Sequence, residues 1–250
     1  MNSTQKINWQ NWIERYDRMQ ERYLVKRGER FDIIAELIKA ICPNPRLIVD
    51  LGCGTGSLAI RLLEEFDATK IYAVDLDPAI LLLAGHRLKH FGNRVQIVQS
   101  NITKMDWDQC RGADAVVSAT ALHWLKPEDL EVVYLQIHKI LNNGGVFLNA
   151  DHTGSSNNLI QRYWESNREQ MRVQEQTQSA DDWEGFWRQF LSELGDDVRI
   201  ERQKALGPWQ GAEEGMPLQW HFQKLEQCGF EYVDCFWRCD CDAIYGAIKK

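Results

Sequence analysis

The chain lacks several features that would place it in a specialised class of protein. Its 250 residues carry 29 Lys and Arg against 36 Asp and Glu, a formal net charge of −7, whereas nucleic-acid binding needs a concentrated basic surface. No basic run and no uninterrupted apolar run of membrane-spanning length occurs. The first residues have no long apolar stretch of the signal-peptide type. We therefore predict a cytoplasmic protein without a nucleic-acid or membrane partner.

Cysteine is present, but in no pattern that binds metal or builds a disulfide framework. Zinc sites favour paired Cys-x-x-Cys motifs, and the chain has none. A chain of this length can bury a sizeable core without cross-links. We expect no metal site and reduced thiols at all seven cysteines, which are Cys42, Cys53, Cys110, Cys228, Cys235, Cys239 and Cys241.

The most informative segment is Leu47–Ser57, which reads Leu-Ile-Val-Asp-Leu-Gly-Cys-Gly-Thr-Gly-Ser. An apolar run rich in β-branched residues reaches Asp50 and then breaks into three glycines at alternate positions, and an amphipathic stretch to Phe66 follows. This order predicts a buried strand, a tight turn and a helix, the opening of a nucleotide-binding βαβ unit. Glycine suits such a turn because a Cβ would keep the backbone away from a ligand and because some turn positions need a positive φ.

The glycine spacing distinguishes two kinds of ligand. A dinucleotide fingerprint runs Gly-x-Gly-x-x-Gly, with the pyrophosphate resting on the helix N-terminus. Here the third glycine, Gly56, comes one residue early, and Ser57 stands where the fingerprint has Gly or Ala. The pattern Val-Asp-Leu-Gly-x-Gly-x-Gly instead resembles motif I of the class I S-adenosylmethionine (SAM)-dependent methyltransferases. That resemblance implies a phosphate-free cofactor, SAM, whose methionine end meets the turn.

Alternating apolar patterns predict an α/β fold with a doubly wound, mostly parallel sheet. With the resemblance, we expect a seven-stranded Rossmann-like methyltransferase fold that ends in an antiparallel C-terminal hairpin. A helix stop and turn are expected at Asn142–Gly145. The expected strands span 46–51, 70–75, 94–99, 113–119, 145–150, 230–238 and 242–248, and helices are expected at 57–66, 78–91, 127–141 and 219–227.

Composition shifts divide the chain into four parts. Residues 1–45 have the spacing of helices, which we expect to cover the cofactor cleft, and residues 46–152 form the SAM-binding α/β core. Residues 153–216 break the alternation and are interpreted as a helical insertion that caps the substrate. Residues 217–250 add the last helix and the hairpin. Five of the ten tryptophans fall between 153 and 220, which indicates an enclosed, partly apolar pocket.

The carboxyl ends of parallel strands are where such folds bind ligands. The second expected strand ends at Asp75, 23 residues beyond Gly52. A carboxylate there can accept hydrogen bonds from both ribose hydroxyls, whereas it would repel a 2′-phosphate. The alternative role, a helix-capping carboxylate, is better suited to Asp77, which directly precedes Pro78.

The resemblance assigns the remaining cofactor contacts by position. It implies that Asp50 orients the methionine end and that the Ser118 carbonyl lies near the cofactor ammonium. Asn101 stands where the family often has Asp, and its amide oxygen can still accept from the adenine amino group. The full expected cofactor-binding set is Asp50, Gly52, Cys53, Gly54, Asp75, Leu76, Asn101, Ile102 and Ser118.

Two histidines follow strand ends and are candidate general bases. His123 follows the fourth expected strand and His152 follows the fifth, and an imidazole that titrates near neutrality can deprotonate an acceptor. The plainer alternative is that His123 packs beside Trp124 and shapes the pocket. A carboxylate acceptor would need a positive partner, for which the sequence offers Arg162, Arg168 and Arg172 without deciding among them.

The function that we predict is transfer of a methyl group from SAM to a small-molecule acceptor by in-line displacement, by a monomer or homodimer. The segment from Ser118 to Ala121 reads Ser-Ala-Thr-Ala, not the Asn/Asp-Pro-Pro-Tyr type of motif of amino-methylating DNA enzymes. A SAM-binding regulatory or scaffold protein without turnover is the second interpretation. A nucleotide-sugar or NAD enzyme of related fold is the third, and Ser57 disfavours it.

Overall fold

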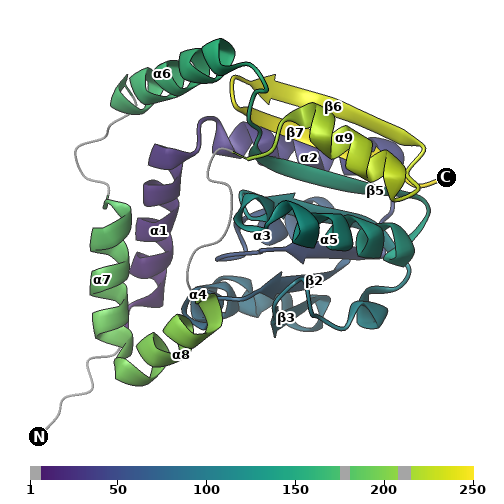
Figure 1. The fold of residues 1–250 in the computed structure, drawn as a ribbon. Helices are drawn as coiled ribbons and strands as arrows, with labels where there is room; N and C mark the ends of the chain where they lie inside the picture. Colours follow the sequence, from purple (N-terminus) through teal and green to yellow (C-terminus); the bar gives the residue numbers. More distant parts are fainter. Residues whose placement is uncertain (1–6, 175–180, 208–214) are drawn as a thin grey trace, which may run out of the picture.

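A computed structural model describes residues 7–174, 181–207 and 215–250. Its centre is a seven-stranded sheet in the order β3-β2-β1-β4-β5-β7-β6 (Figure 1). Strands β1 to β5 are parallel, whereas β7 runs antiparallel to both β5 and β6. This confirms the expected fold. The strands are β1 (Leu47–Leu51), β2 (Lys70–Asp75), β3 (Val95–Gln99), β4 (Ala113–Ala119), β5 (Leu141–His152), β6 (Tyr232–Cys239) and β7 (Asp242–Ile248).

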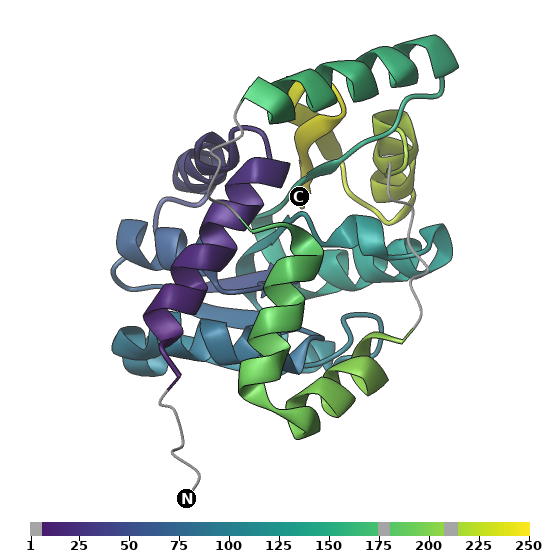
Figure 2. The same ribbon diagram turned by 90° about the vertical axis from the view of Figure 1, so that its left-hand side faces the viewer.

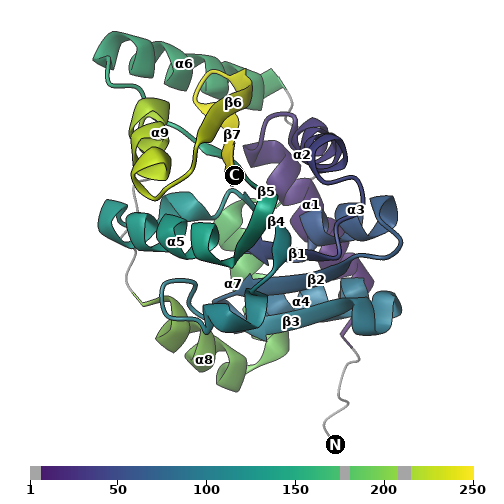
Figure 3. The ribbon, with the colours of Figure 1, turned by 90° about the vertical axis from the view of Figure 1, so that its right-hand side faces the viewer.

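Helices cover both faces of this sheet, and each face has its own apolar core. On one face, Ile48 of β1 packs with residues of α2 and α3, whereas Val49 and Leu51 pack on the other face with α5 and α9 (Figure 3). Because strands covered on both sides bury every side chain, β1 reads as a continuous apolar run. The described helices are α1 (Trp9–Tyr23), α2 (Arg27–Ile41), α3 (Ser57–Glu65), α4 (Pro78–Leu88), α5 (Pro127–Ile140), α6 (Asn158–Gln174), α7 (Trp183–Leu194), α8 (Asp196–Leu206) and α9 (Leu218–Gln227).

Two boundaries differ from the sequence prediction by more than two residues. Strand β5 begins at Leu141 and not at 145, so residues 142–145 lie inside it as a bulge, between the pairs Ala113–Leu141 and Ala115–Val146. The bulge is anchored to the C-terminal strand because the Gly144 N–H donates to the Lys249 carbonyl. Helix α4 ends at Leu88, and a 3₁₀ segment continues from Lys89 to Arg94.

A second layer lies across the carboxyl ends of the parallel strands. Helices α1 and α7 run side by side there, and α8 continues from α7 towards α4 (Figure 2). An aromatic cluster joins them: Phe186 and Phe190 of α7 are fully buried, and Trp12 of α1 meets Phe186 edge-on with ring centroids 5.6 Å apart. The contacts of these side chains hold α7 on α1.

Helix α6 does not join this layer. It lies beside the turn between β6 and β7, where the Arg238 guanidinium stacks on Trp164 at 4.4 Å and the Asn167 amide bonds Asp240. The region that the sequence assigned to one cap therefore divides in space, with α7 and α8 at the strand ends and α6 at the hairpin. Among the described residues, no helix is long and apolar enough to cross a membrane.

We expect Phe186→Ala to lower the free energy of unfolding by roughly 3 kcal/mol or more, since it removes a fully buried ring and leaves a cavity between α1 and α7. Urea denaturation measures this. The matched control is Ile200→Ala on α8, because that side chain is 45% exposed and its loss should change stability little. Equal losses in the two variants would contradict the packing described for α7.

Candidate functional site

A cavity of about 710 Å³ lies between the carboxyl ends of β1, β2 and β4 and the helices α1, α7 and α8. The turn that follows β1 forms part of its floor. Gly52 and Gly54 have φ of +71° and +54°, left-handed values that glycine adopts without strain. A Cβ on Gly52 would lie 2.2 Å from the Ala121 Cβ, so this position admits no side chain, and the turn presents bare backbone to the cavity.

Asp50 lies at this floor with an incomplete set of partners. Its side chain is 1% exposed, and its Oδ2 atom has no hydrogen-bond partner among the described residues. Burial, with a smaller effect from the neighbouring Asp75, raises the pKa of Asp50 to about 7. A buried carboxylate oxygen without a partner is unfavourable unless a ligand supplies a donor or a positive charge.

Asp75 ends β2 beside the glycine turn. One carboxylate oxygen accepts the Gly54 N–H at 2.8 Å, and the other accepts the Asp77 N–H at 3.0 Å. Burial nevertheless raises the pKa of Asp75 to about 6, against the effect of these bonds. Asp77 behaves as the sequence predicts, because it caps α4 through the Ala79 N–H. It also pairs with Arg202 of α8 at 2.7 Å, which ties the helical layer to the strand ends.

The other expected cofactor residues differ in their placement. Cys53, Leu76, Asn101 and Ile102 line the cavity. The Asn101 Oδ1 already accepts two hydrogen bonds from Thr103, at 2.9 and 2.8 Å, so the oxygen expected to meet an amine is engaged.

Ser118 itself is not among the residues that line the cavity, and the contact expected of its backbone carbonyl stays a prediction. Ser118 is fully buried within the sheet, where its hydroxyl donates to the Leu51 carbonyl at 2.8 Å. The lining begins one residue later, at Ala119.

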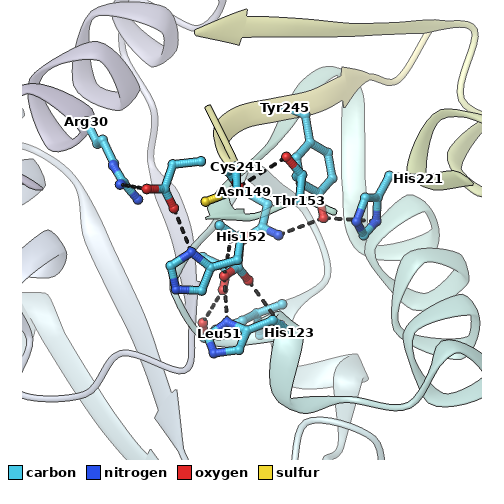
Figure 4. Close-up of polar contacts among 12 residues, drawn as sticks. Arg30, Leu51, His123, Asn149, His152, Thr153, His221, Cys241 and Tyr245 are labelled. Atoms are coloured by element: carbon cyan, nitrogen blue, oxygen red, sulfur yellow. Dashed lines mark hydrogen bonds and ion pairs between the residues drawn. The ribbon is translucent and has the colours of Figure 1, made fainter. Parts of the chain in front are cut away.

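Two histidine–aspartate pairs form the wall of the cavity at the ends of β4 and β5 (Figure 4). His123 Nδ1 lies 2.6 Å from Asp151 Oδ1, and its backbone N–H donates to the other oxygen. His152 Nδ1 lies 2.6 Å from Asp242 Oδ1. The two imidazole rings are 5.0 Å apart, so the structure brings both candidate bases together.

A buried ion pair holds Asp242, the partner of His152, in place. Arg30 of α2 is 2% exposed, and its Nη2 atom lies 2.8 Å from Asp242 Oδ2. The bond from His152 and the charge of Arg30 lower the pKa of Asp242 in spite of its burial. His123 and His152 likewise hold the pKa of Asp151 far below its usual range. Both carboxylates are therefore ionised near neutral pH and keep each Nδ1 protonated.

A buried polar network lies near this wall, on the same face of β5 as Asp151. The Asn149 amide donates to the Tyr245 hydroxyl at 2.8 Å, and that hydroxyl lies 2.9 Å from the hydroxyl of Tyr134. Tyr134 in turn lies 2.8 Å from His221 Nδ1. Burial lowers the pKa of His221 to about 4, so its ring is neutral at physiological pH.

Sequence reasoning missed the partners of these histidines. Asp242 faces His152 across the antiparallel pair of β5 and β7, so the sheet register carries this contact. Nothing in the sequence around Arg30 signals its position, because it comes from a helix more than 200 residues away from Asp242.

Two of the three arginines proposed for a carboxylate acceptor, Arg162 and Arg168, do not line the cavity. Arg162 donates to the Asn158 carbonyl within α6. The side chain of Arg172 lies outside the described residues. The cavity lining instead includes Arg27 and Arg202.

The cysteines form no disulfide among the described residues. All seven cysteines are free thiols, as expected. Within the part of the chain that the structure describes, no group of three or more His, Cys, Asp or Glu side chains is arranged to hold a metal ion.

Comparison with known proteins agrees with this architecture. Residues 48–145 match the model of a methyltransferase domain family. With the seven-stranded fold and the glycine turn, this match makes residues 48–145 similar to a methyltransferase domain.

Individual relatives are more distant. The chain is 26% identical over 136 residues to a carboxy-S-adenosyl-L-methionine synthase of Campylobacter lari, covering 54% of this chain and 57% of that protein. It is 26% identical over 175 residues to a malonyl-[acyl-carrier protein] O-methyltransferase of Halalkalibacterium halodurans, covering 68% and 63%. The chain thus matches about three fifths of the length of these relatives.

Solved structures share the fold at low sequence identity. Human N-acetylserotonin methyltransferase, in complex with SAM, has a TM-score of 0.54 and 16% identity, with 97% of this chain and 58% of that chain covered. A protein from Methanococcus maripaludis assigned to the SAM-dependent methyltransferases has a TM-score of 0.56 and 18% identity, with coverage of 100% and 95%.

The ion pair of Asp151 predicts a pH dependence of stability. Because the pKa of Asp151 in the folded protein lies below its ordinary value of 3.8, its stabilisation is present above that value and is lost as the pH falls. Asp151→Asn should lower the free energy of unfolding at pH 7 by roughly 3 kcal/mol and make its decline between pH 5 and 3 shallower. Urea titrations at each pH measure both effects, with exposed Asp67→Asn as control. A decline as steep as in the wild type would contradict the assignment.

Proposed function

We propose that this protein transfers the methyl group of SAM to a small-molecule acceptor. One observation carries the proposal: two carboxyl groups, the buried Asp50 and the half-buried Asp75, meet a glycine-rich turn in one cavity, and Asp50 has an oxygen without a partner among the described residues. Their negative potential and the lack of a Cβ at Gly52 and Gly54 suit a cationic ligand that approaches the backbone closely. A diphosphate would be repelled by the same carboxylates.

The chain offers distinct surfaces to the parts of the cofactor. Asp50 would accept from the ammonium group of the methionine end, next to the backbone of Gly52, Cys53 and Gly54. Asp75 would accept from the ribose hydroxyls, because a carboxylate has capacity beyond the two backbone bonds that it makes here. Leu76 and Ile102 would flank the adenine, with Asn101 at its edge. When bound, SAM supplies an activated methyl group that a nucleophile takes by in-line displacement.

The histidine wall provides the chemistry on the acceptor side. Asp151 and Asp242 fix the Nδ1 side of His123 and His152. Either ring could take a proton from the acceptor, in the case of His152 through Nε2. Aromatic side chains of Trp124, Trp183 and Phe31 line the same cavity and would exclude water from the reacting atoms. We infer that the acceptor is a small molecule with a protonated oxygen or nitrogen nucleophile.

Turnover assays test this function directly. Purified protein is incubated with SAM and a panel of phenols, alcohols, amines and carboxylic acids, and S-adenosylhomocysteine release is measured by mass spectrometry. We expect release with at least one acceptor class and loss of more than tenfold in kcat for His152→Gln, with exposed His90→Gln as control. Tight SAM binding without product from any class would favour a regulatory SAM-binding protein instead.

Removing the charge of Asp75 should weaken cofactor binding. We expect Asp75→Asn to cost about 2 kcal/mol of SAM binding energy, because hydrogen bonds to a charged acceptor are stronger than those to an amide. Isothermal titration calorimetry measures the dissociation constant, and Asp67→Asn serves as an exposed control. Unchanged affinity, with an unchanged melting temperature, would refute the ribose assignment.

The raised pKa of Asp50 makes SAM affinity depend on pH. In the free protein this carboxyl is protonated below pH 7, whereas a cationic ligand favours its ionised form. SAM binding should therefore weaken by up to about tenfold per unit as the pH falls from 7 towards 6, and release a proton. Asp75, with a pKa of about 6, steepens the loss below pH 6. Calorimetry in two buffers of different ionisation enthalpy measures the proton release, and Asp50→Asn should abolish the part between pH 7 and 6. A pH-independent affinity would contradict the role of Asp50.

A further inference from the structure

Arg27 is a cavity residue to which neither the sequence motifs nor the preceding proposal gives a role. It is the first residue of α2, and its side chain lines the cavity with only 13% of its surface exposed. The residue before it, Lys26, has a φ of +55°, so a left-handed backbone bend directs the start of α2. The Arg27 guanidinium lies 4.9 Å from the ring of Phe31, one turn along the same helix, which holds it in place.

The ion pair of Arg27 is long. Asp17 of α1 faces Arg27 at 3.6 Å, beyond hydrogen-bond distance, and faces Arg87 of α4 at 2.5 Å. One carboxylate thus serves two guanidinium groups, and it binds the nearer one. Glu21 is the other acidic group close to Arg27, and its side chain is exposed to solvent. The two acidic groups match the two guanidinium groups in number, but Asp17 bonds Arg87 and Glu21 faces solvent, so Arg27 is the less closely paired of the two cations.

The Ser57 hydroxyl supports the same distribution of charge. It donates to Asp17 at 3.2 Å and accepts from Arg87, so Asp17 is held towards α3 and α4 and away from Arg27. The N-cap of α3 is Gly56, which provides no side chain to cap the helix. The positive end of this helix adds to the potential on the same side of the cavity. Burial lowers the pKa of Arg27, which is the expected sign for a charge that its neighbours under-compensate.

The other two cations of the cavity wall differ from Arg27. Arg202 bonds Asp77 at 2.7 Å and stacks on Trp187 at 3.8 Å, so its charge is already matched. Lys126 is exposed at the start of α5. Arg27 alone among these three combines burial with a distant counter-charge.

We propose that Arg27 binds a carboxylate group in this cavity. A guanidinium matches a carboxylate with two parallel hydrogen bonds, and the walls around Arg27 would exclude water from the pair. Two sources have this chemistry: the methionine end of the cofactor, in which case Asp50 and Arg27 bind the opposite charges of one amino acid, or a carboxylated acceptor. The first source rests on the proposed function, whereas the second does not need the cofactor.

The first arm of the test compares two nucleosides that differ in the amino-acid part. S-adenosylhomocysteine carries the carboxylate, and 5′-methylthioadenosine lacks it. We expect Arg27→Met to raise the dissociation constant of S-adenosylhomocysteine at least tenfold, measured by calorimetry. The dissociation constant of 5′-methylthioadenosine should change less than twofold. Arg27→Lys should lie between wild type and Arg27→Met, because it keeps the charge and loses the paired geometry. Equal losses for the two nucleosides would exclude the cofactor as the source.

The second arm titrates benzoate and hexanoate, with benzamide and hexanamide as neutral matches, into the free protein and into the protein saturated with S-adenosylhomocysteine. If the acceptor supplies the carboxylate, Arg27→Met weakens binding of the two acids at least tenfold and leaves binding of the two amides unchanged. Asp17→Asn should tighten carboxylate binding in whichever arm responds, since it removes the nearest competing carboxylate.

The two arms together decide the proposal. Folding of each variant is checked by its melting temperature and by its affinity for 5′-methylthioadenosine. If the wild-type protein binds neither nucleoside, the proposed function fails. The titrations of the two acids into the free protein then still test whether Arg27 binds a carboxylate. If Arg27→Met matches wild type for S-adenosylhomocysteine and for both acids, the carboxylate site is refuted.

Discussion

The exclusion of water from the carboxyl groups at the ends of β1 and β2 is the constraint on which the site depends. Asp50 and Asp75 are held by strands with apolar cores on both faces, and burial raises the pKa of each. Neither can move to solvent without disrupting the sheet. A ligand that brings hydrogen-bond donors and positive charge offsets this desolvation penalty. The site should therefore bind a cationic nucleoside more tightly than a neutral or anionic one.

Two other aspartates of the same sheet have pKa values shifted in the opposite direction. Asp151 and Asp242 are as deeply buried as Asp50, yet their pKa values are lowered because histidine and arginine groups contact them. The cavity is therefore divided. On the floor, one oxygen of Asp50 has no hydrogen-bond partner among the described residues, whereas on the wall the carboxylates contact and orient two imidazole rings. Cofactor binding would thus use aspartates whose pKa is raised, and proton transfer would use histidines held by aspartates whose pKa is lowered.

The helical layer links these parts and adds a third kind of charge. Arg202 of α8 bonds the cap of α4, Phe186 of α7 packs on α1, and α1 carries the Asp17 carboxylate that two arginines share. Elements from both ends of the chain therefore complete a cavity whose floor belongs to residues 46–152. The under-compensated Arg27 and the unpartnered Asp50 oxygen are complementary in sign, as the two ends of an amino acid are.

The sequence by itself determined the order of the elements and the floor of the site. Apolar runs, glycines at alternate positions and an acid 23 residues after Gly52 are local signals, and they place Asp50, Asp75 and both histidines at strand ends, because parallel strands all end at one edge. Tertiary structure alone decided which groups complete the site. Ser118 is buried by its neighbours, and Arg30 reaches Asp242 from a distant helix. Arg27 lines the cavity, whereas Arg162 and Arg168 do not. Such contacts depend on sheet register and helix packing, which join residues far apart in the chain and leave no periodic trace in the sequence.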